Sequence, residues 1–239
     1  MRLGCRSRGG ATRAGGGTRV RPAGASRRGA ERRSQRLDRP RRARDGASPA
    51  RGDGHREQDV RLRGIALQNL GAVYAQQQDL DAAERAFAES HTCFERCSYE
   101  RGQAIALNNR GRVALDRGDA ARATDVLAQA VRAARDVEDE ELIALATTNL
   151  AEATLGTADY ARANDLVCTA LGHFRESGNR WREVECLRLL GVISARRGHT
   201  VEARRCLERG MALAREIDAR LEVAAISTEL DRLAEPSKP

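Results

Sequence analysis

The sequence returns to one pattern of small and apolar residues every forty positions. The first occurrence, "NLGAVYAQQQDLDAAERAF", covers residues 69–87, and later occurrences begin at Asn109, Asn149 and Leu189. One column of this register holds only alanine and three others are nearly uniform: Ala83, Ala123, Ala163 and Ala203; Gly71, Gly111, Ala151 and Gly191; Phe87, Leu127, Val167 and Leu207; and Asp79, Asp119, Asp159 and His199. A repeat of this length predicts an array of structural units that stack on one another.

Each unit contains two apolar patterns of helical spacing with a polar break between them, which predicts two helices. The breaks place Asp119 and Asp159 at the start of the second helix, where a carboxylate accepts hydrogen bonds from free backbone N–H groups. Gly118 suits the left-handed residue that ends the preceding helix. The glycine and alanine columns allow two antiparallel helices to approach closely.

A single helix pair cannot bury its apolar face, so neighbouring pairs must stack. We therefore predict an all-α fold, an α-solenoid of four antiparallel helix pairs within residues 61–239. The units cover about 62–100, 101–140, 141–180 and 181–219, and a polar capping helix follows at 220–233. No matching cap precedes residue 62. The first repeat is therefore expected to expose an apolar face or to meet a partner there, and self-association is one candidate.

Residues 1–60 differ sharply in composition from the array. They hold seventeen arginines against six acidic residues, a local charge of 17 − 6 = +11, and they contain no aromatic residue. We expect a disordered Arg/Gly-rich tail, because such a segment cannot bury enough apolar surface to offset its chain entropy. Two interpretations of the tail stay open: it contacts nucleic acid non-specifically through phosphates, or it is compositional bias without a function.

The composition also bears on location. No run of eighteen apolar residues is present, so we expect no membrane span, and the start of the chain lacks the apolar core of a signal peptide. The six cysteines are interpreted as reduced thiols of a cytoplasmic protein. Cys186 and Cys206 fall in columns of small core residues. Cys93 and Cys97 have metal-ligand spacing, but packing is the favoured interpretation.

The first unit resembles the tetratricopeptide repeat family, which has Leu-Gly, Tyr, Ala and an aromatic residue at the positions of Leu70, Gly71, Tyr74, Ala83 and Phe87. Later units depart from this pattern at the Tyr position, and the family's closing proline is absent. The forty-residue unit is similar to the repeats of kinesin light chains and to the sensor arrays of bacterial NTPase-linked transcription regulators. The resemblance covers about residues 62–233 and implies a right-handed superhelix.

The resemblance also implies a binding surface. First helices line the concave face in this family, and Asn69, Asn109 and Asn149 match the position that holds a bound peptide backbone. A carboxamide suits this task because it both donates and accepts hydrogen bonds. The alternative is that these side chains bond internally to the adjacent helix. Arg112 and Arg188 lie near the same groove and favour an acidic or carboxylate-bearing partner.

Catalytic motifs are not recognisable in the sequence. The glycine-rich stretch "GGATRAGGG" lacks the spacing of a phosphate-binding loop, and the four histidines have no partners at metal-ligand spacing. We therefore predict no enzyme activity, no cofactor and no metal. The favoured function is a non-catalytic module that binds a peptide or protein partner on its concave surface. The alternative is a detached or partner-dependent sensor array in bacterial transcriptional regulation, with the basic tail contacting DNA.

Overall fold

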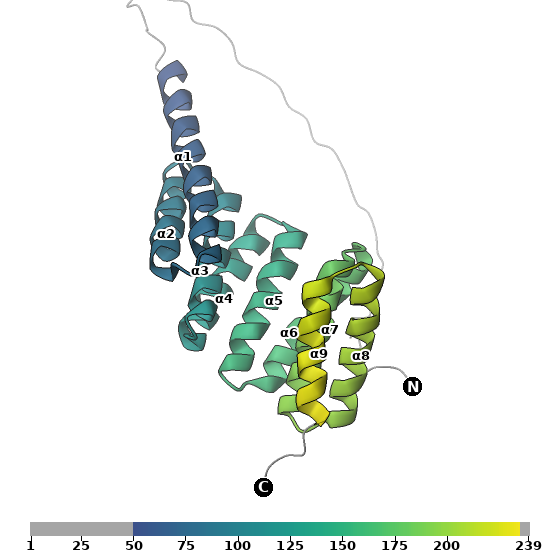
Figure 1. The fold of residues 1–239 in the computed structure, drawn as a ribbon. Helices are drawn as coiled ribbons and strands as arrows, with labels where there is room; N and C mark the ends of the chain where they lie inside the picture. The colour runs from purple at the N-terminus through teal and green to yellow at the C-terminus, as the bar shows by residue number, and fades with distance from the viewer. Residues whose placement is uncertain (1–49, 235–239) are drawn as a thin grey trace, which may run out of the picture. The chain divides into compact units, whose positions relative to one another are not determined.

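The computed structural model describes residues 50–234, which form helices joined by three-residue connections and contain no strand (Figure 1). The helices are α1 (Ala50–Gln76), α2 (Leu80–Arg96), α3 (Glu100–Asp116), α4 (Ala120–Asp136), α5 (Glu140–Gly156), α6 (Tyr160–Glu176), α7 (Arg180–Arg196), α8 (Thr200–Glu216) and α9 (Arg220–Ala234). Consecutive helices pack against each other throughout. The prediction of an all-α solenoid is therefore confirmed.

The connections share one geometry. The middle residue of each connection has a positive φ: Gln78, Ser98, Gly118, Glu138, Ala158, Gly178, Gly198 and Asp218. Only three of these eight residues are glycine. In the connection after α3, the N–H groups of Gly118 and Asp119 donate to Leu115 O at 2.8 Å and Ala114 O at 2.9 Å. This is the Schellman arrangement, which satisfies the last free carbonyl groups of a helix.

The next helix begins with a side-chain cap in most cases. Asp119 accepts from the N–H of Arg122 at 3.0 Å, and Asp79 and Asp159 cap α2 and α6 in the same way, as predicted. Asp139 and Asn179 do so for α5 and α7. His199 makes no side-chain cap bond at the start of α8. Each cap of this kind contributes about 1 kcal/mol.

The small columns decide how closely the helices of a pair approach. Ala83, Ala123, Ala163 and Ala203 have no exposed surface. A Cβ atom at Gly111 would lie 2.4 Å from Leu127 Cγ, and one at Gly191 would lie 2.5 Å from Leu207 Cγ. In the third pair the glycine is replaced by Ala151, and the facing residue is the smaller Val167. In this pair the two columns therefore compensate in volume.

Helix α9 ends the described array with a polar outer face. Ile226 is fully buried against α8 in a cluster with Met211 and Ala214. The face that would meet a second helix of a fifth pair carries exposed polar residues instead, among them Thr228 and Asp231. Asp231 occupies the register position of Gly191, so the close helix approach seen in the other pairs does not recur. This helix acts as the cap that the sequence predicted.

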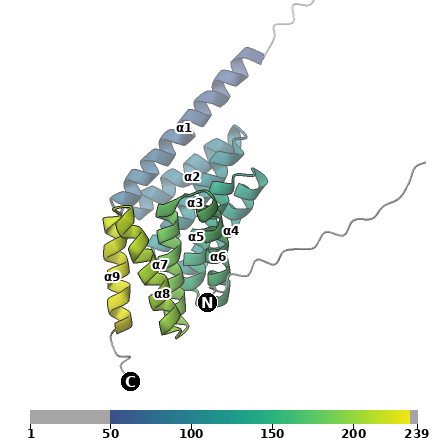
Figure 2. The ribbon, with the colours of Figure 1, turned by 90° about the vertical axis from the view of Figure 1, so that its right-hand side faces the viewer.

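One predicted boundary is wrong. Helix α1 begins at Ala50, so the last eleven residues of the expected disordered tail, 50–60, are helical, and the helix extends beyond the end of α2 (Figure 2). The helical span includes Arg56, Glu57, Asp59 and Arg61, side chains of both signs that a helix surface tolerates. The rest of the predicted tail, residues 1–49, lies outside the described residues.

Candidate functional site

The odd-numbered helices form one layer of the array. Helix α3 contacts α1 and α5, and α7 contacts α5 and α9, whereas among the described even-numbered helices none contacts another. First helices therefore lie closer together than second helices. This spacing curves the array toward the odd-numbered helices, and we call their shared surface the inner face. The five residues that the sequence predicted for ligand binding all belong to odd-numbered helices.

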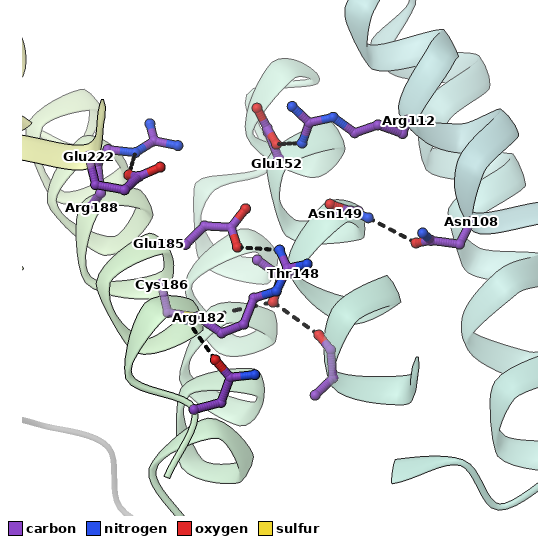
Figure 3. Close-up of polar contacts among 12 residues, drawn as sticks. Asn108, Arg112, Thr148, Asn149, Glu152, Arg182, Glu185, Cys186, Arg188 and Glu222 are labelled. Carbon is purple, nitrogen blue, oxygen red and sulfur yellow. Dashed lines mark hydrogen bonds and ion pairs between the residues drawn. The ribbon is translucent and has the colours of Figure 1, made fainter. Parts of the chain in front are cut away.

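The three asparagines of the predicted ladder have different environments. Asn149 is buried and its Nδ2 donates to Asn108 Oδ1 at 2.8 Å, across the contact between α5 and α3 (Figure 3). Asn109 is half-buried, and its Oδ1 lies 3.5 Å from Asn108 Nδ2, a long hydrogen bond. Asn69 is exposed. The internal alternative therefore describes Asn149, whereas Asn109 and Asn69 have carboxamides within reach of solvent.

Both predicted arginines are ion-paired along the inner face. Arg112 Nη1 lies 2.8 Å from Glu152 Oε2, forty residues later on α5, and Arg188 Nε lies 3.3 Å from Glu222 Oε2 on α9 (Figure 3). Arg182 pairs with Glu185 at 2.7 Å. Glu152, Glu185 and Glu222 were not predicted from the sequence. The signal was present at Arg112 and Glu152, which occupy the same column of consecutive repeats.

A hollow of about 280 Å³ opens on the inner face between α3 and α5. Its lining includes Ile105, Leu145, Asn109 and Arg182. At its rim Arg101 Nε donates to Asp139 Oδ2 at 2.7 Å. The backbone N–H of Leu142 is the main reason that the pKa of Asp139 lies below its ordinary value, and Arg101 adds to the shift. The hollow combines apolar walls with a polar rim, an arrangement that suits a side chain of a bound chain.

Below this surface lies a small buried polar seam. Thr148 Oγ1 donates to Ala144 O at 3.0 Å and lies 3.9 Å from Cys186 Sγ (Figure 3). Burial raises the pKa of Cys186 to about 12, so this thiol stays protonated and unreactive at neutral pH. Cys93, Cys186 and Cys206 are buried core residues, in agreement with the packing interpretation, whereas Cys97 is half-buried.

Metal and membrane chemistry find no support in the described part of the chain. Residues 50–234 contain no group of three or more His, Cys, Asp or Glu side chains placed to hold a metal ion. In the same range, no helix is both long and apolar enough to cross a bilayer. What the inner face offers is a set of hydrogen-bonding groups and apolar side chains.

The fold and this face define a helix-pair repeat protein of the solenoid class. Residues 62–136 match the sequence model of the tetratricopeptide repeat family. This segment therefore consists of tetratricopeptide repeats, as the sequence predicted. The likeness to solved structures extends the fold to most of the array.

Three of these structures illustrate the likeness. Aspartyl phosphate phosphatase F from Bacillus subtilis has a TM-score of 0.65 and 13% identity over 71% of this chain and 45% of its own. A Rap protein complexed with competence and sporulation factor has a TM-score of 0.63 and 18% identity over 72% and 46%. A putative kinesin light chain from Podospora anserina has a TM-score of 0.57 and 15% identity over 72% and 88%.

These identities establish the fold alone. The chain spans less than half the length of the phosphatase and of the complexed Rap protein. No curated protein matches the sequence.

Proposed function

We propose that this protein is a non-catalytic module whose inner face binds a peptide or protein segment. The observation that carries the proposal is the hollow between α3 and α5, where Asn109 stands beside the apolar walls of Ile105 and Leu145. An apolar side chain of the ligand fits the hollow, and the Asn109 carboxamide pairs with the ligand's backbone. A solved Rap protein of similar fold is complexed with competence and sporulation factor, which supports a binding role for an array of this kind. A cytoplasmic location is part of the same proposal.

The asparagines divide into two roles in this proposal. Asn109, which lines the hollow, contacts the ligand, and Asn149 supports the surface from below through its bond to Asn108. Asn69 is exposed on α1 and does not line the hollow, so it is left out of this contact. Arg112 and Arg188 contribute by exchange: a carboxylate of the ligand takes the place of Glu152 or Glu222. Because each exchange breaks an existing ion pair, its net gain is small. The ligand is therefore selected by its backbone and its apolar side chain more than by its charge.

A display library of short peptides, selected on the immobilised full-length protein, tests the proposal and supplies a ligand for calorimetry. We expect Asn109→Ala to weaken the selected peptide about tenfold, the loss of about one net hydrogen bond. Its thermal unfolding should match that of the parent, because this carboxamide makes only a marginal internal bond. Unchanged affinity of the selected peptide for Asn109→Ala would disprove the assignment of the ligand to the inner face. Selected peptides that bind outside the inner face would disprove it as well.

We propose DNA contact by the basic segment as a second candidate function, in the context of transcriptional signalling. The observation that favours it is the charge distribution, since residues 1–60 carry +11 and the remaining residues carry 25 − 28 = −3. Binding through phosphates has a steep salt dependence. Gel shifts over a salt series should show tighter binding for the full chain than for residues 50–239, the span that starts where α1 begins. Equal affinity for the two proteins would remove the idea.

A further inference from the structure

One face of α1 is exposed although it repeats the residues that the later first helices bury. Leu70 is 42% exposed, whereas Leu150 and Leu190 in the same column are 4% and 8% exposed. Val73 is 46% exposed, whereas Val113, Ala153 and Ile193 are at most 1% exposed. In α9, Ile226, Leu230 and Leu233 use these columns to pack on α8. The face of α1 is therefore the stacking surface of the array, without a described neighbour on it.

This surface, which we call the α1 face, consists of Leu62, Ile65, Ala66, Asn69, Leu70 and Val73. It lies at the opposite end of the described array from α9 (Figure 1). Residues 64–78 contain no charged side chain, in a chain of which 32% is charged. A solvated helix surface is normally rich in charges, whereas the centre of a protein interface is depleted of them. The composition of the α1 face is therefore that of an interface.

The preceding part of the chain is a poor cover for this face. Residues 1–49 contain four large apolar residues, Met1, Leu3, Val20 and Leu37, and these are far apart in an Arg/Gly-rich sequence. Covering a helix face requires apolar residues three or four positions apart, as in the later helices of the array. The α1 face itself has this spacing, which makes a second α1 helix a suitable partner.

We infer that the α1 face binds the α1 face of a second copy of this chain, in an antiparallel two-fold pair. Antiparallel pairing sets Leu62 against Val73 of the second copy, Ile65 against Leu70, and the smaller Ala66 against Asn69. A two-fold contact of this kind is isologous, so a single self-complementary stripe suffices.

The charges of α1 select this orientation over a parallel one. Its charged residues from position 56 on, Arg56, Glu57, Asp59, Arg61 and Arg63, all precede residue 64. Arg61 stacks on the Tyr99 ring and Arg63 pairs with Glu89 of α2, so Asp59 is the charge taken to flank the face. In the antiparallel pair Asp59 meets the uncharged second half of the other helix, at Gln76. In a parallel pair Asp59 would lie beside its own copy, and such like-charge contacts are destabilising. The pair therefore combines apolar contact with an absence of charge conflict.

The size of the stripe sets the expected strength. From Leu62 to Val73 it covers about 16 Å along the helix axis at about 1.5 Å per residue. Two such stripes bury less than the roughly 800 Å² per partner of a standard interface. We therefore expect a dimer that dissociates on dilution, with a Kd on the order of 10 µM.

Sedimentation velocity of the full-length protein over a concentration series measures this equilibrium. Leu70→Asp should raise the Kd at least tenfold or so, because a carboxylate would be buried in the contact. Leu221→Asp is the matched control: it introduces the same charge at an apolar side chain that is 86% exposed on α9, and it should leave the Kd unchanged. Circular dichroism melts of both variants establish that the helices are intact.

Charge pairing tests the orientation independently of stability. Leu62→Lys and Val73→Glu should each weaken the homodimer, and an equimolar mixture of the two variants should restore association. The antiparallel register brings the new lysine beside the new glutamate, whereas a parallel register keeps them apart. A parent protein that stays monomeric throughout the concentration series overturns the proposal. This holds both where a different protein covers the α1 face and where residues 1–49 cover it. It is also overturned by a dimer that Leu70→Asp does not weaken, or by a mixture that does not associate.

Discussion

Asn149 and Asn108 lie forty-one residues apart in the chain and share a 2.8 Å hydrogen bond in the contact between α5 and α3. Both side chains are 5% exposed, so water does not replace the bond when either partner is lost. The fourth repeat has Leu189 in the column of Asn149, also 5% exposed. The array therefore tolerates an apolar residue at this position where no carboxamide faces it.

This bond predicts strong coupling between the two asparagines. Asn149→Ala leaves Asn108 Oδ1 without its donor, and we expect a loss of about 1–3 kcal/mol in the free energy of unfolding. Asn108→Ala should have a similar cost, and the double variant should cost less than the sum of the two. Urea unfolding of the parent, the two single variants and the double variant measures this coupling. Additive losses would show that the hydrogen bond contributes nothing to stability.

The glycine and leucine columns predict a rescue. Gly111→Ala places a methyl group 2.4 Å from Leu127 Cγ, and overpacking of this kind costs about 1–3 kcal/mol. The third repeat relieves the same crowding with Ala151 and Val167. We therefore expect Gly111→Ala combined with Leu127→Val to recover stability relative to Gly111→Ala alone, as measured by thermal unfolding. Gly172→Ala on the open side of α6, where no atom lies within 4 Å of the added Cβ, is the control and should be tolerated.

The buried Cys186 thiol predicts a loss of stability at alkaline pH. Its pKa is raised by burial from the ordinary 9.0 to about 12, so the folded state keeps a proton that the unfolded state releases above pH 9. Stability is unaffected below that value and falls as the pH rises toward 12, by at most about 1.4 kcal/mol per pH unit. Cys186→Ala restores the residue found at positions 106 and 146 and removes this dependence. Urea unfolding at about pH 8 and about pH 10.5 should show that the parent loses more stability between these pH values than Cys186→Ala does. Parallel pH profiles of the two proteins would contradict the prediction.

Asp139 predicts a smaller effect in acid. Its pKa is lowered, chiefly by the N–H of Leu142 and also by Arg101, so its contribution is fully present above pH 3.8 and is lost as the pH falls through the lowered value. Asp139→Asn retains an acceptor oxygen for the helix cap but cannot titrate. The difference in thermal unfolding midpoint between parent and variant should therefore shrink between about pH 6 and about pH 3. A constant difference would mean that the carboxylate charge has no role.

The sequence by itself determined the repeating architecture of the array. Columns of Ala, Gly and apolar residues at a forty-residue interval can be satisfied only by stacked helix pairs, and short acceptors such as Asp119 specify where helices begin. These are local or periodic requirements, so a single sequence displays them. The left-handed connection at Gly118 was visible for the same reason, whereas the same conformation at Gln78 and Glu138 has no comparable residue signature.

Only the tertiary structure decided what each residue of a column contacts. Asn69, Asn109 and Asn149 are identical in sequence terms, yet one is exposed, one is half-buried and one is buried. The difference arises because each repeat is covered by the one before it, and the partner across that contact varies: Asn108 stands opposite Asn149, and no described residue covers the α1 face. The pairing of Arg112 with Glu152 has the same origin. Burial and pairing are properties of the stack, because the residues that create them lie some forty positions away in the chain.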